Sequence, residues 1–339
     1  MSQQLTPDRL SDLPDDILHC IMGFLSGKDI ASMAALSRRF RSAWSVFPVI
    51  DINKSVLTND LLAAVKLSLQ RLRATHIFGL NKFRLNFEFI RMNQHSPIRE
   101  LIDSVMENNV KELDVNFCPP KLFEQLRIFY SLKTLQLEDY HALQMDIVAP
   151  NLEYFSLIRK LSRCLHHQWI DMSSCKSVRT LILETPGVSE EWLAIHLSNF
   201  SLLENIKIMA DRLNSFVCKG NNWSICQIDI EAKCLRNLEI EISINKPMPC
   251  FVVHLPSTCY EVKLILKLHM QAFEVGFWFK VLTDFLVCFG HCKVSTLVCN
   301  SAKVLSFLEE LRDDMVPPLL DLKHLKVEIF PCLVLPWHD

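Results

Sequence analysis

A six-residue pattern, apolar-x-x-apolar-x-apolar, recurs along most of this 339-residue chain and limits what the chain can fold into. The last two apolar residues of each copy alternate with polar ones, which is typical of a strand with one buried face. Early copies follow one another at intervals of 20 to 26 residues, and later intervals reach 35. Such spacing predicts an α/β repeat fold, and the spread predicts an irregular one. The copies lie at Val110/Leu113/Val115, Leu132/Leu135/Leu137, Leu152/Phe155/Leu157, Val178/Leu181/Leu183, Leu203/Ile206/Ile208, Leu235/Leu238/Ile240, Cys259/Val262/Leu264, Val294/Leu297/Cys299 and Leu322/Leu325/Val327.

Similarity between two nine-residue segments of the chain supports the repeat interpretation. Residues 144–152 and 227–235 share Gln, Asp, Ile, Ala and Leu at a constant offset of 83. The intervals fall partly within the range of about 20 to 29 residues that leucine-rich repeats use. The pattern is degenerate, so a generic α/β domain with many short strands is the alternative.

Residues 13–44 predict three short helices. Pro14 suits a first helical position, because the N–H that proline lacks needs no partner there. Two acids then complement the positive end of the helix, and an apolar stripe follows at Ile17, Leu18, Ile21 and Leu25. About thirty residues cannot bury that much apolar surface alone, so this segment needs either the rest of the chain or another protein.

The N-terminal segment resembles the F-box, a three-helix module that docks on the Skp adaptor of Skp/cullin/F-box ubiquitin ligases. The resemblance rests on Leu13-Pro14 followed by two acids, on the apolar stripe, on Lys28-Asp29-Ile30, and on the closing Arg-Arg-Phe-Arg-x-x-Trp from Arg38. Phe40 stands where many relatives carry Trp. An amphipathic helical cap of a larger domain is the alternative. The resemblance implies adaptor contacts at Leu13, Pro14, Asp16, Ile17, Leu18, Ile21, Leu25, Ile30, Leu36, Phe40 and Trp44.

Composition narrows the classes of function. Acidic and basic residues are interspersed and the net charge is −2, so we expect neither a nucleic acid nor a membrane surface as partner. Residues 1–12 lack the apolar region of a signal peptide, and no run is long enough to span a bilayer. Thirteen cysteines without framework spacing indicate reduced thiols, and hence the cytoplasm or nucleus. Glycine is scarce and never clustered, which argues against phosphate-cradling loops and therefore against nucleotide-binding enzymes.

Two groups of residues could carry chemistry. Cys288, His291, Cys292 and Cys299 offer ligand types that zinc prefers, but they lack paired Cys-x-x-Cys knuckles, so buried thiols are the favoured interpretation. Cys164 with His166 and His167 could supply a nucleophile and a base, but no orienting acid is placed nearby. We therefore expect no metal, no cofactor and no catalytic residue.

The repeat pattern also predicts a target-binding face. The residue between the two inward positions of each strand, and the residue after them, should point toward the concave side. These candidates are Asp114, Asn116, Gln136, Glu138, Ser156, Glu184, Lys207, Met209, Glu239, Glu241, Lys263, Lys326 and Glu328.

An F-box followed by degenerate leucine-rich repeats resembles the plant-type F-box/leucine-rich-repeat proteins. The expected organisation is an F-box at 8–50, a helical connector at 51–75, and an irregular leucine-rich-repeat solenoid at 76–339. The resemblance implies a non-catalytic substrate-recognition subunit that binds a Skp adaptor, and through it a cullin, while the repeats hold an unknown target protein. The alternative is a free-standing repeat protein that scaffolds or sequesters a partner without a ligase.

Overall fold

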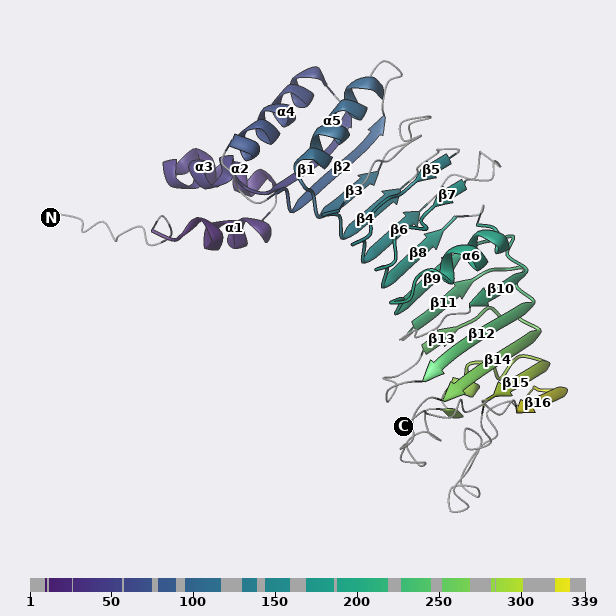
Figure 1. Ribbon diagram of the computed structural model, residues 1–339. Helices are drawn as coiled ribbons and strands as arrows, with labels where there is room; N and C mark the ends of the chain where they lie inside the picture. Colours follow the sequence, from purple (N-terminus) through teal and green to yellow (C-terminus); the bar gives the residue numbers. More distant parts are fainter. Residues whose placement is uncertain are drawn as a thin grey trace, which may run out of the picture.

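The protein is a mixed α/β molecule whose strands follow one another along a curved row (Figure 1). Over the described residues the α/β class expected from the sequence is confirmed, with helices first and parallel strands after them. The computed structural model describes residues 10, 12–25, 27–56, 58–74, 79–89, 95–116, 130–138, 144–158, 169–185, 188–218, 227–244, 252–268, 282–283, 285–300 and 321–329.

Three N-terminal helices form a small unit with its own core. These are α1 (Asp15–Gly23), α2 (Gly27–Leu36) and α3 (Arg38–Ser45). Pro14 caps α1 in an extended conformation and so stands one residue before the first helical position that the sequence analysis gave it, and Ser37 precedes α3 in an extended conformation too. The buried apolar residues of this unit form a cluster separate from the main core: Leu18, Met22, Ile30, Phe40, Ala43 and Phe47.

The largest element is a nine-stranded sheet in which every neighbouring pair is parallel. Its strands lie in the order in which they occur along the chain, but strands β5, β7, β10 and β12 belong to other sheets. The strands are β1 (Val49–Val56), β2 (Lys82–Phe89), β3 (Glu112–Asn116), β4 (Thr134–Glu138), β6 (Tyr154–Ile158), β8 (Thr180–Glu184), β9 (Asn205–Met209), β11 (Gln227–Glu231) and β13 (Val252–His254).

The register of this sheet aligns its buried residues from strand to strand. Leu113 lies opposite Leu135, which lies opposite Phe155, and the row continues through Leu181 to Ile206. All five side chains are buried. Each one contributes about 1.5–3 kcal/mol through removal from water, so the row of inward residues fixes the register.

A second row of elements packs against the same core. The helices α4 (Asn59–Ala74) and α5 (His95–Glu107) contact each other at its N-terminal end. The strands β5 (Gln144–Asp146) and β7 (Trp169–Asp171) pair next, and Trp192 of α6 (Glu190–Leu197) donates a hydrogen bond to Ile170 O of β7. The helix α6 contacts the first strand of a five-stranded parallel sheet that completes the row: β10 (Ser215–Cys218), β12 (Asn237–Ile244), β14 (Glu261–Leu268), β15 (Val294–Cys299) and β16 (His324–Ile329).

The expectation of one continuous array of strands is therefore wrong in one respect. The pattern copies ending at Ile208 and Ile240 follow each other in the list above, but β9 and β12 lie in different sheets. The sheet neighbour of β9 is β11, where Ile228 and Ile230 are the buried pair. Between β4 and β14 the chain alternates between the two rows, so copies that are consecutive in sequence need not be neighbours in space.

The copy on β15 is also shifted in register by two residues relative to the copies on both neighbouring strands. Leu297, the second residue of its copy, lies opposite Leu264 and Val327, which are the third residues of theirs. In addition, Leu325 and Val327 are exposed although the pattern predicts that they point inward.

Residues 51–75, expected as a helical connector, contribute to both rows. They include most of β1, which pairs in parallel with β2, and the whole of α4. The side chains of Leu62, Val65 and Leu69 are buried in the same core as the strands. The main core thus begins at β1.

Leu135 provides a test of the register. Leu135→Asp should unfold much of the sheet, because the new carboxylate would be desolvated without a partner in the middle of the buried row. Gln136→Asp introduces the same side chain one residue later, where the chain faces outward; it loses the hydrogen bond to Tyr154 and faces Asp114, but it stays solvated, so it should cost only about 1 kcal/mol of unfolding free energy. Thermal unfolding of the two variants followed by circular dichroism measures the difference. Equal melting temperatures would show that the register is wrong.

Candidate functional site

The N-terminal unit divides the predicted adaptor-binding residues into three groups. Leu18, Ile30 and Phe40 are buried in the small core, so in this structure they join the helices and do not face a partner. Leu13, Ile21 and Leu25 are partly exposed at its edge. The exposed members are Pro14, Asp16, Ile17, Leu36 and Trp44.

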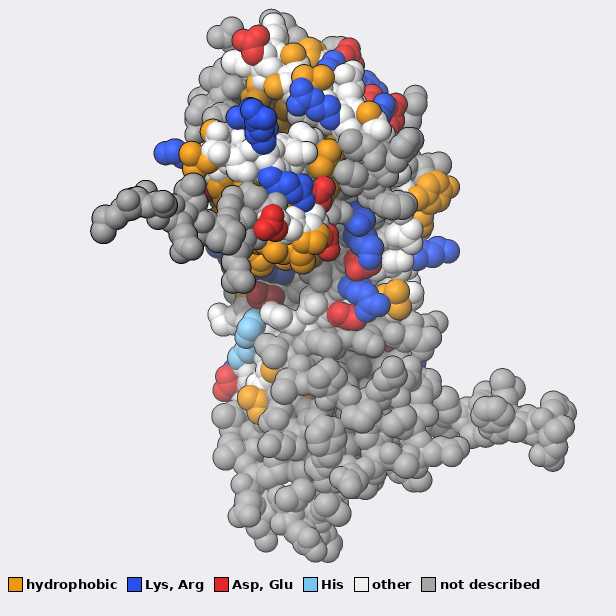
Figure 2. Space-filling model, turned by 90° about the vertical axis from the view of Figure 1, so that its left-hand side faces the viewer, with side chains coloured by type: hydrophobic (Ala, Val, Ile, Leu, Met, Phe, Trp, Pro, Cys, Tyr) orange, Lys and Arg blue, Asp and Glu red, His pale blue; other side chains and the backbone are white. Residues whose placement is uncertain are grey.

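Exposed apolar side chains are concentrated on these helices. Leu36 is 89% exposed, Ile17 and Trp44 are each 44% exposed, and Phe24, which the sequence analysis did not select, is 88% exposed. Ile17, Ile21 and Phe24 follow the helical spacing i, i+4, i+7, which is the signal that could have identified Phe24. In the view that faces this end of the molecule, apolar side chains lie among lysine and arginine side chains over its upper part (Figure 2). Side chains of this size exposed together mark a surface suited to a protein partner.

Arg39 connects the first helix to the third. Its Nη2 donates a hydrogen bond of 2.8 Å to Leu13 O, and its Nη1 forms an ion pair with Asp15. His19 adds a contact of 2.9 Å between its Nε2 and Ala43 O. The position of the Leu13-Pro14 segment therefore depends on α3.

A second candidate surface is the outward side of the nine-stranded sheet, here called the outer face. Its residues form rows across the strands, because the register is parallel throughout. One row runs Asp51, Arg84, Asp114, Gln136 and Ser156. Arg84 donates from Nε to Asp114 Oδ2 at 2.7 Å and from Nη1 to Asp51 Oδ2 at 3.2 Å. The hydrogen bond to Asp114 is the main cause that raises the pKa of the Arg84 guanidinium.

The neighbouring row of the outer face begins with amides. Asn53, Asn86 and Asn116 lie opposite one another on β1, β2 and β3. Asn86 donates to Asn53 at 3.4 Å, and Asn116 donates to Glu138 Oε2 at 2.7 Å. Most polar groups in this half of the outer face are thus paired with the adjacent strand.

The predicted target-binding residues do not share one surface. Ser156 lies on the outer face but is buried. Those from Asp114 to Met209 lie on the nine-stranded sheet, whereas Glu239, Glu241, Lys263, Lys326 and Glu328 lie on the five-stranded sheet. The second group pairs locally: Lys263 donates to Glu239 at 3.1 Å, and Lys326 forms an ion pair with Glu328. The expectation of a single continuous concave face is wrong, since the pattern copies alternate between two sheets.

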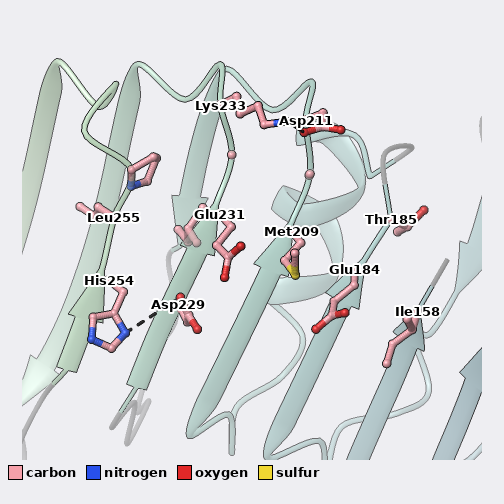
Figure 3. A pocket seen from close by; sticks show the side chains of 14 residues that line it. Ile158, Glu184, Thr185, Met209, Asp211, Asp229, Glu231, Lys233, His254 and Leu255 are labelled. Carbon is pink, nitrogen blue, oxygen red and sulfur yellow. Dashed lines mark ion pairs between the residues drawn. The ribbon is translucent and has the colours of Figure 1, made fainter. Parts of the chain in front are cut away.

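The outer face is hollowed where five of its strands end. The hollow has a volume of about 910 Å³ and is lined by Ile158, Glu184, Thr185, Met209, Ala210, Asp211, Asp229, Ile230, Glu231, Ala232, Lys233, His254, Leu255 and Pro256. Figure 3 shows that these residues lie on neighbouring strands of the sheet or just after them, with Lys233 and Asp211 at the upper edge. The lining therefore combines apolar side chains with charged ones.

Carboxylates dominate the charges of this hollow. Lys207 Nζ donates to Glu184 Oε1 at 2.6 Å, and this hydrogen bond, with the charges of Glu184, Asp229 and Glu231, raises the pKa of the Lys207 ammonium. His254 Nδ1 lies 4.0 Å from Asp229 Oδ1, and Lys233 lies 3.5 Å from Asp211.

Of the residues that line the hollow, sequence reasoning selected only Glu184 and Met209. Asp229, Glu231 and His254 belong to β11 and β13, which were not counted as pattern copies. The signal was present, because the pattern also occurs at Ile225/Ile228/Ile230, with Asp229 and Glu231 at its outward positions. Leu213/Phe216/Cys218 is a further uncounted copy and forms β10.

The candidate metal and nucleophile groups gain no support. Among the described residues, no group of three or more His, Cys, Asp or Glu side chains is placed to hold a metal ion. Cys292 and Cys299 are buried, and burial raises the pKa of the Cys299 thiol, as for a structural cysteine. Cys164, His166 and His167 lie outside the described residues. Over the described part of the chain, no helix has the length and apolarity needed to cross a membrane.

Comparison with known proteins identifies the N-terminal unit. Residues 10–50 match the F-box domain, which covers α1, α2 and α3. A protein of Arabidopsis thaliana named for an F-box and leucine-rich repeats is 30% identical over 226 residues, 62% of this chain and 51% of the relative. An F-box/FBD/LRR-repeat protein of the same plant is 25% identical over 229 residues, 66% of this chain and 50% of the relative. The resemblance to plant-type F-box/leucine-rich-repeat proteins is confirmed. The chain spans about half the length of the curated relatives it matches, and no solved structure matches it.

Arg39 provides a test of how the first helix is held. Arg39→Met removes the hydrogen bond to Leu13 O and the ion pair with Asp15, which should cost about 1 kcal/mol locally because both contacts are partly exposed. The amides of Asp15–Gly23 should then exchange with solvent faster, whereas those of the sheet should not. The control is Arg38→Met, an exposed neighbour with the same loss of charge. Equal exchange of α1 in both variants would contradict the role assigned to Arg39.

Proposed function

We propose that this chain is a substrate-recognition subunit of a Skp/cullin/F-box E3 ubiquitin ligase. The F-box helices bind the Skp adaptor, and through it a cullin, and the strand-bearing part binds a target protein. The observation that carries this proposal is the coincidence of the F-box match with the exposed apolar side chains of α1 and α2.

The chain itself performs no chemistry in this proposal. It accelerates ubiquitin transfer by holding the target near the transferring enzyme, so that an encounter between separate molecules becomes one within a single assembly. That mechanism needs two separate binding surfaces on one rigid body. The continuous core from Ile52 to Cys299 supports such rigidity within the strand-bearing part, and Val49 at the start of β1 packs against the separate core of the F-box helices.

The part after the F-box is proposed to be an irregular leucine-rich-repeat solenoid. Parallel neighbours in chain order, aligned buried positions and a second row of helices and strands support it. The proposed organisation remains an F-box at 8–50, a connector at 51–75 and repeats at 76–339. The pairing of β1 with β2 makes 51–75 an integral first turn of the array.

The proposed location is the cytoplasm or the nucleus. The eight cysteines of the described residues are all free thiols, as a reducing compartment favours. Ubiquitin ligation by such an assembly takes place in these compartments.

A scaffold or sequestering protein outside any ligase is the alternative. Its strand-bearing part would bind a partner in the same way, and the F-box helices would need no adaptor. The two functions differ in whether α1 and α2 carry a binding surface, which the following experiments test.

Ile17→Asp should abolish capture of a Skp adaptor without unfolding the chain. Ile17 is 44% exposed, so the change costs little folding free energy, but a carboxylate buried against the adaptor would be desolvated without a partner. The matched control is Leu67→Asp on α4, where the leucine is 47% exposed and lies outside the F-box match. Pull-down with purified adaptor and a thermal melt of each variant measure the outcome. Retained capture by Ile17→Asp would favour the scaffold.

The chain produced alone should self-associate, and co-production with a Skp adaptor should yield a one-to-one complex. Phe24 and Leu36 motivate this expectation, because such exposed apolar side chains associate when no partner covers them. Size-exclusion chromatography with light scattering measures the mass of each preparation. A monodisperse monomer obtained without a partner would contradict the expectation.

A further inference from the structure

The charges of the outer face are matched at its N-terminal end and unmatched at the hollow. Arg84 is shared by Asp51 and Asp114, and the amides of β1, β2 and β3 bond with their neighbours. At the hollow, Lys207 is bonded to Glu184 and also interacts with the charges of Asp229 and Glu231, so one lysine serves three carboxylates. No ion pair among the described residues neutralises Glu231. A cation brought into the hollow would therefore gain more than one brought elsewhere on the sheet.

The register explains how the carboxylates are arranged. Glu184, Met209 and Glu231 lie opposite one another on β8, β9 and β11, so the methionine stands between two acids. Adjacent strands are about 4.8 Å apart, which places the two glutamate positions about 10 Å from each other. Figure 3 shows both side chains beside Met209. A long side chain could lay its aliphatic part along the thioether and its charged end beside Glu231, the acid of the two that has no ion pair among the described residues.

The occupant that fits these features is an extended protein segment. A volume of about 910 Å³ exceeds what one side chain fills and accommodates a few residues. The lining is drawn from the ends of five neighbouring strands and is partly apolar, as at Ile158 and Leu255, which suits residues flanking a charged one.

We propose that the hollow is the target-recognition site and that it binds a lysine or arginine side chain presented by an extended segment of the target. This inference rests on the target-binding half of the proposed function. The charged end lies beside Glu231, on the side away from the ion pair of Lys207 with Glu184, the aliphatic part contacts Met209, and the segment backbone follows the row of strand ends.

Selection of peptides on the full chain tests the proposal. A displayed library of random twelve-residue peptides is selected against the immobilised protein in complex with a Skp adaptor, and the recovered peptides are labelled for fluorescence anisotropy. Recovered peptides should share a lysine or arginine. Replacing that arginine by citrulline, or that lysine by norleucine, should weaken binding at least about tenfold, as expected for loss of a charge-assisted contact.

Paired variants locate the binding site. Glu184→Gln with Glu231→Gln should weaken the basic peptides at least about tenfold. The control, Glu191→Gln with Glu261→Gln, makes the same change of net charge at exposed carboxylates on α6 and β14, and should weaken them less than about twofold. Equal weakening by both pairs would reduce the effect to overall charge and would overturn the proposal.

Two further outcomes would also overturn it: recovery of peptides without a shared basic residue, and recovery of no binding peptide. Adaptor capture measured on the same preparations separates these failures from a failure of the proposed function. If the Glu184→Gln and Glu231→Gln protein still binds the adaptor while the peptide results fail, the inference about the hollow is wrong and the adaptor role stands.

Discussion

The structure depends on one packing constraint, the in-register stacking of the inward apolar pairs. Parallel strands that each bury two side chains can share a core only if the two buried residues of one strand lie directly opposite the two buried residues of the next. Leu135 and Leu137 meet that condition between β3 and β6, and the same holds along the sheet. Because inward positions are aligned, outward positions are aligned too. The rows of Arg84 and Asn86, and the alternation of Glu184, Met209 and Glu231, are consequences of the buried register and not separate features.

The sequence was most informative where a local pattern decides the structure. Alternation predicted that Leu113, Leu135 and Phe155 are inward, and the buried register confirms it. It was least informative about which sheet a strand joins, since Ile206/Ile208 and Leu238/Ile240 look alike but lie in different rows. Which sheet a strand joins depends on the segment that connects it to the preceding strand, and the six-residue pattern does not include that segment. The hollow was missed for a different reason, because the pattern copy at Ile225/Ile228/Ile230, which forms β11, was not counted.

The N-terminal helices show a different limit of sequence reasoning. An apolar stripe does not say which of its members face the helices beside it and which face outward. Leu18 and Ile17 are adjacent in sequence, but the first is buried and the second is exposed, because three crossing helices enclose only part of each stripe. The residues that specify the F-box match are thus partly structural, and a surface for a partner is built from those that remain, together with Phe24.

The difference between the two rows has a geometric consequence for the molecule as a whole. Packed helices stand about 8–10 Å apart, whereas strands stand about 4.8 Å apart. Where α4 and α5 lie behind β1, β2 and β3, each turn of the chain is therefore a wedge, wide on the helix side and narrow on the strand side. Where β10, β12 and β14 lie behind β9, β11 and β13, both sides have the same width and the wedge disappears. Bending should thus be strongest near the F-box and relax toward the C-terminal sheet.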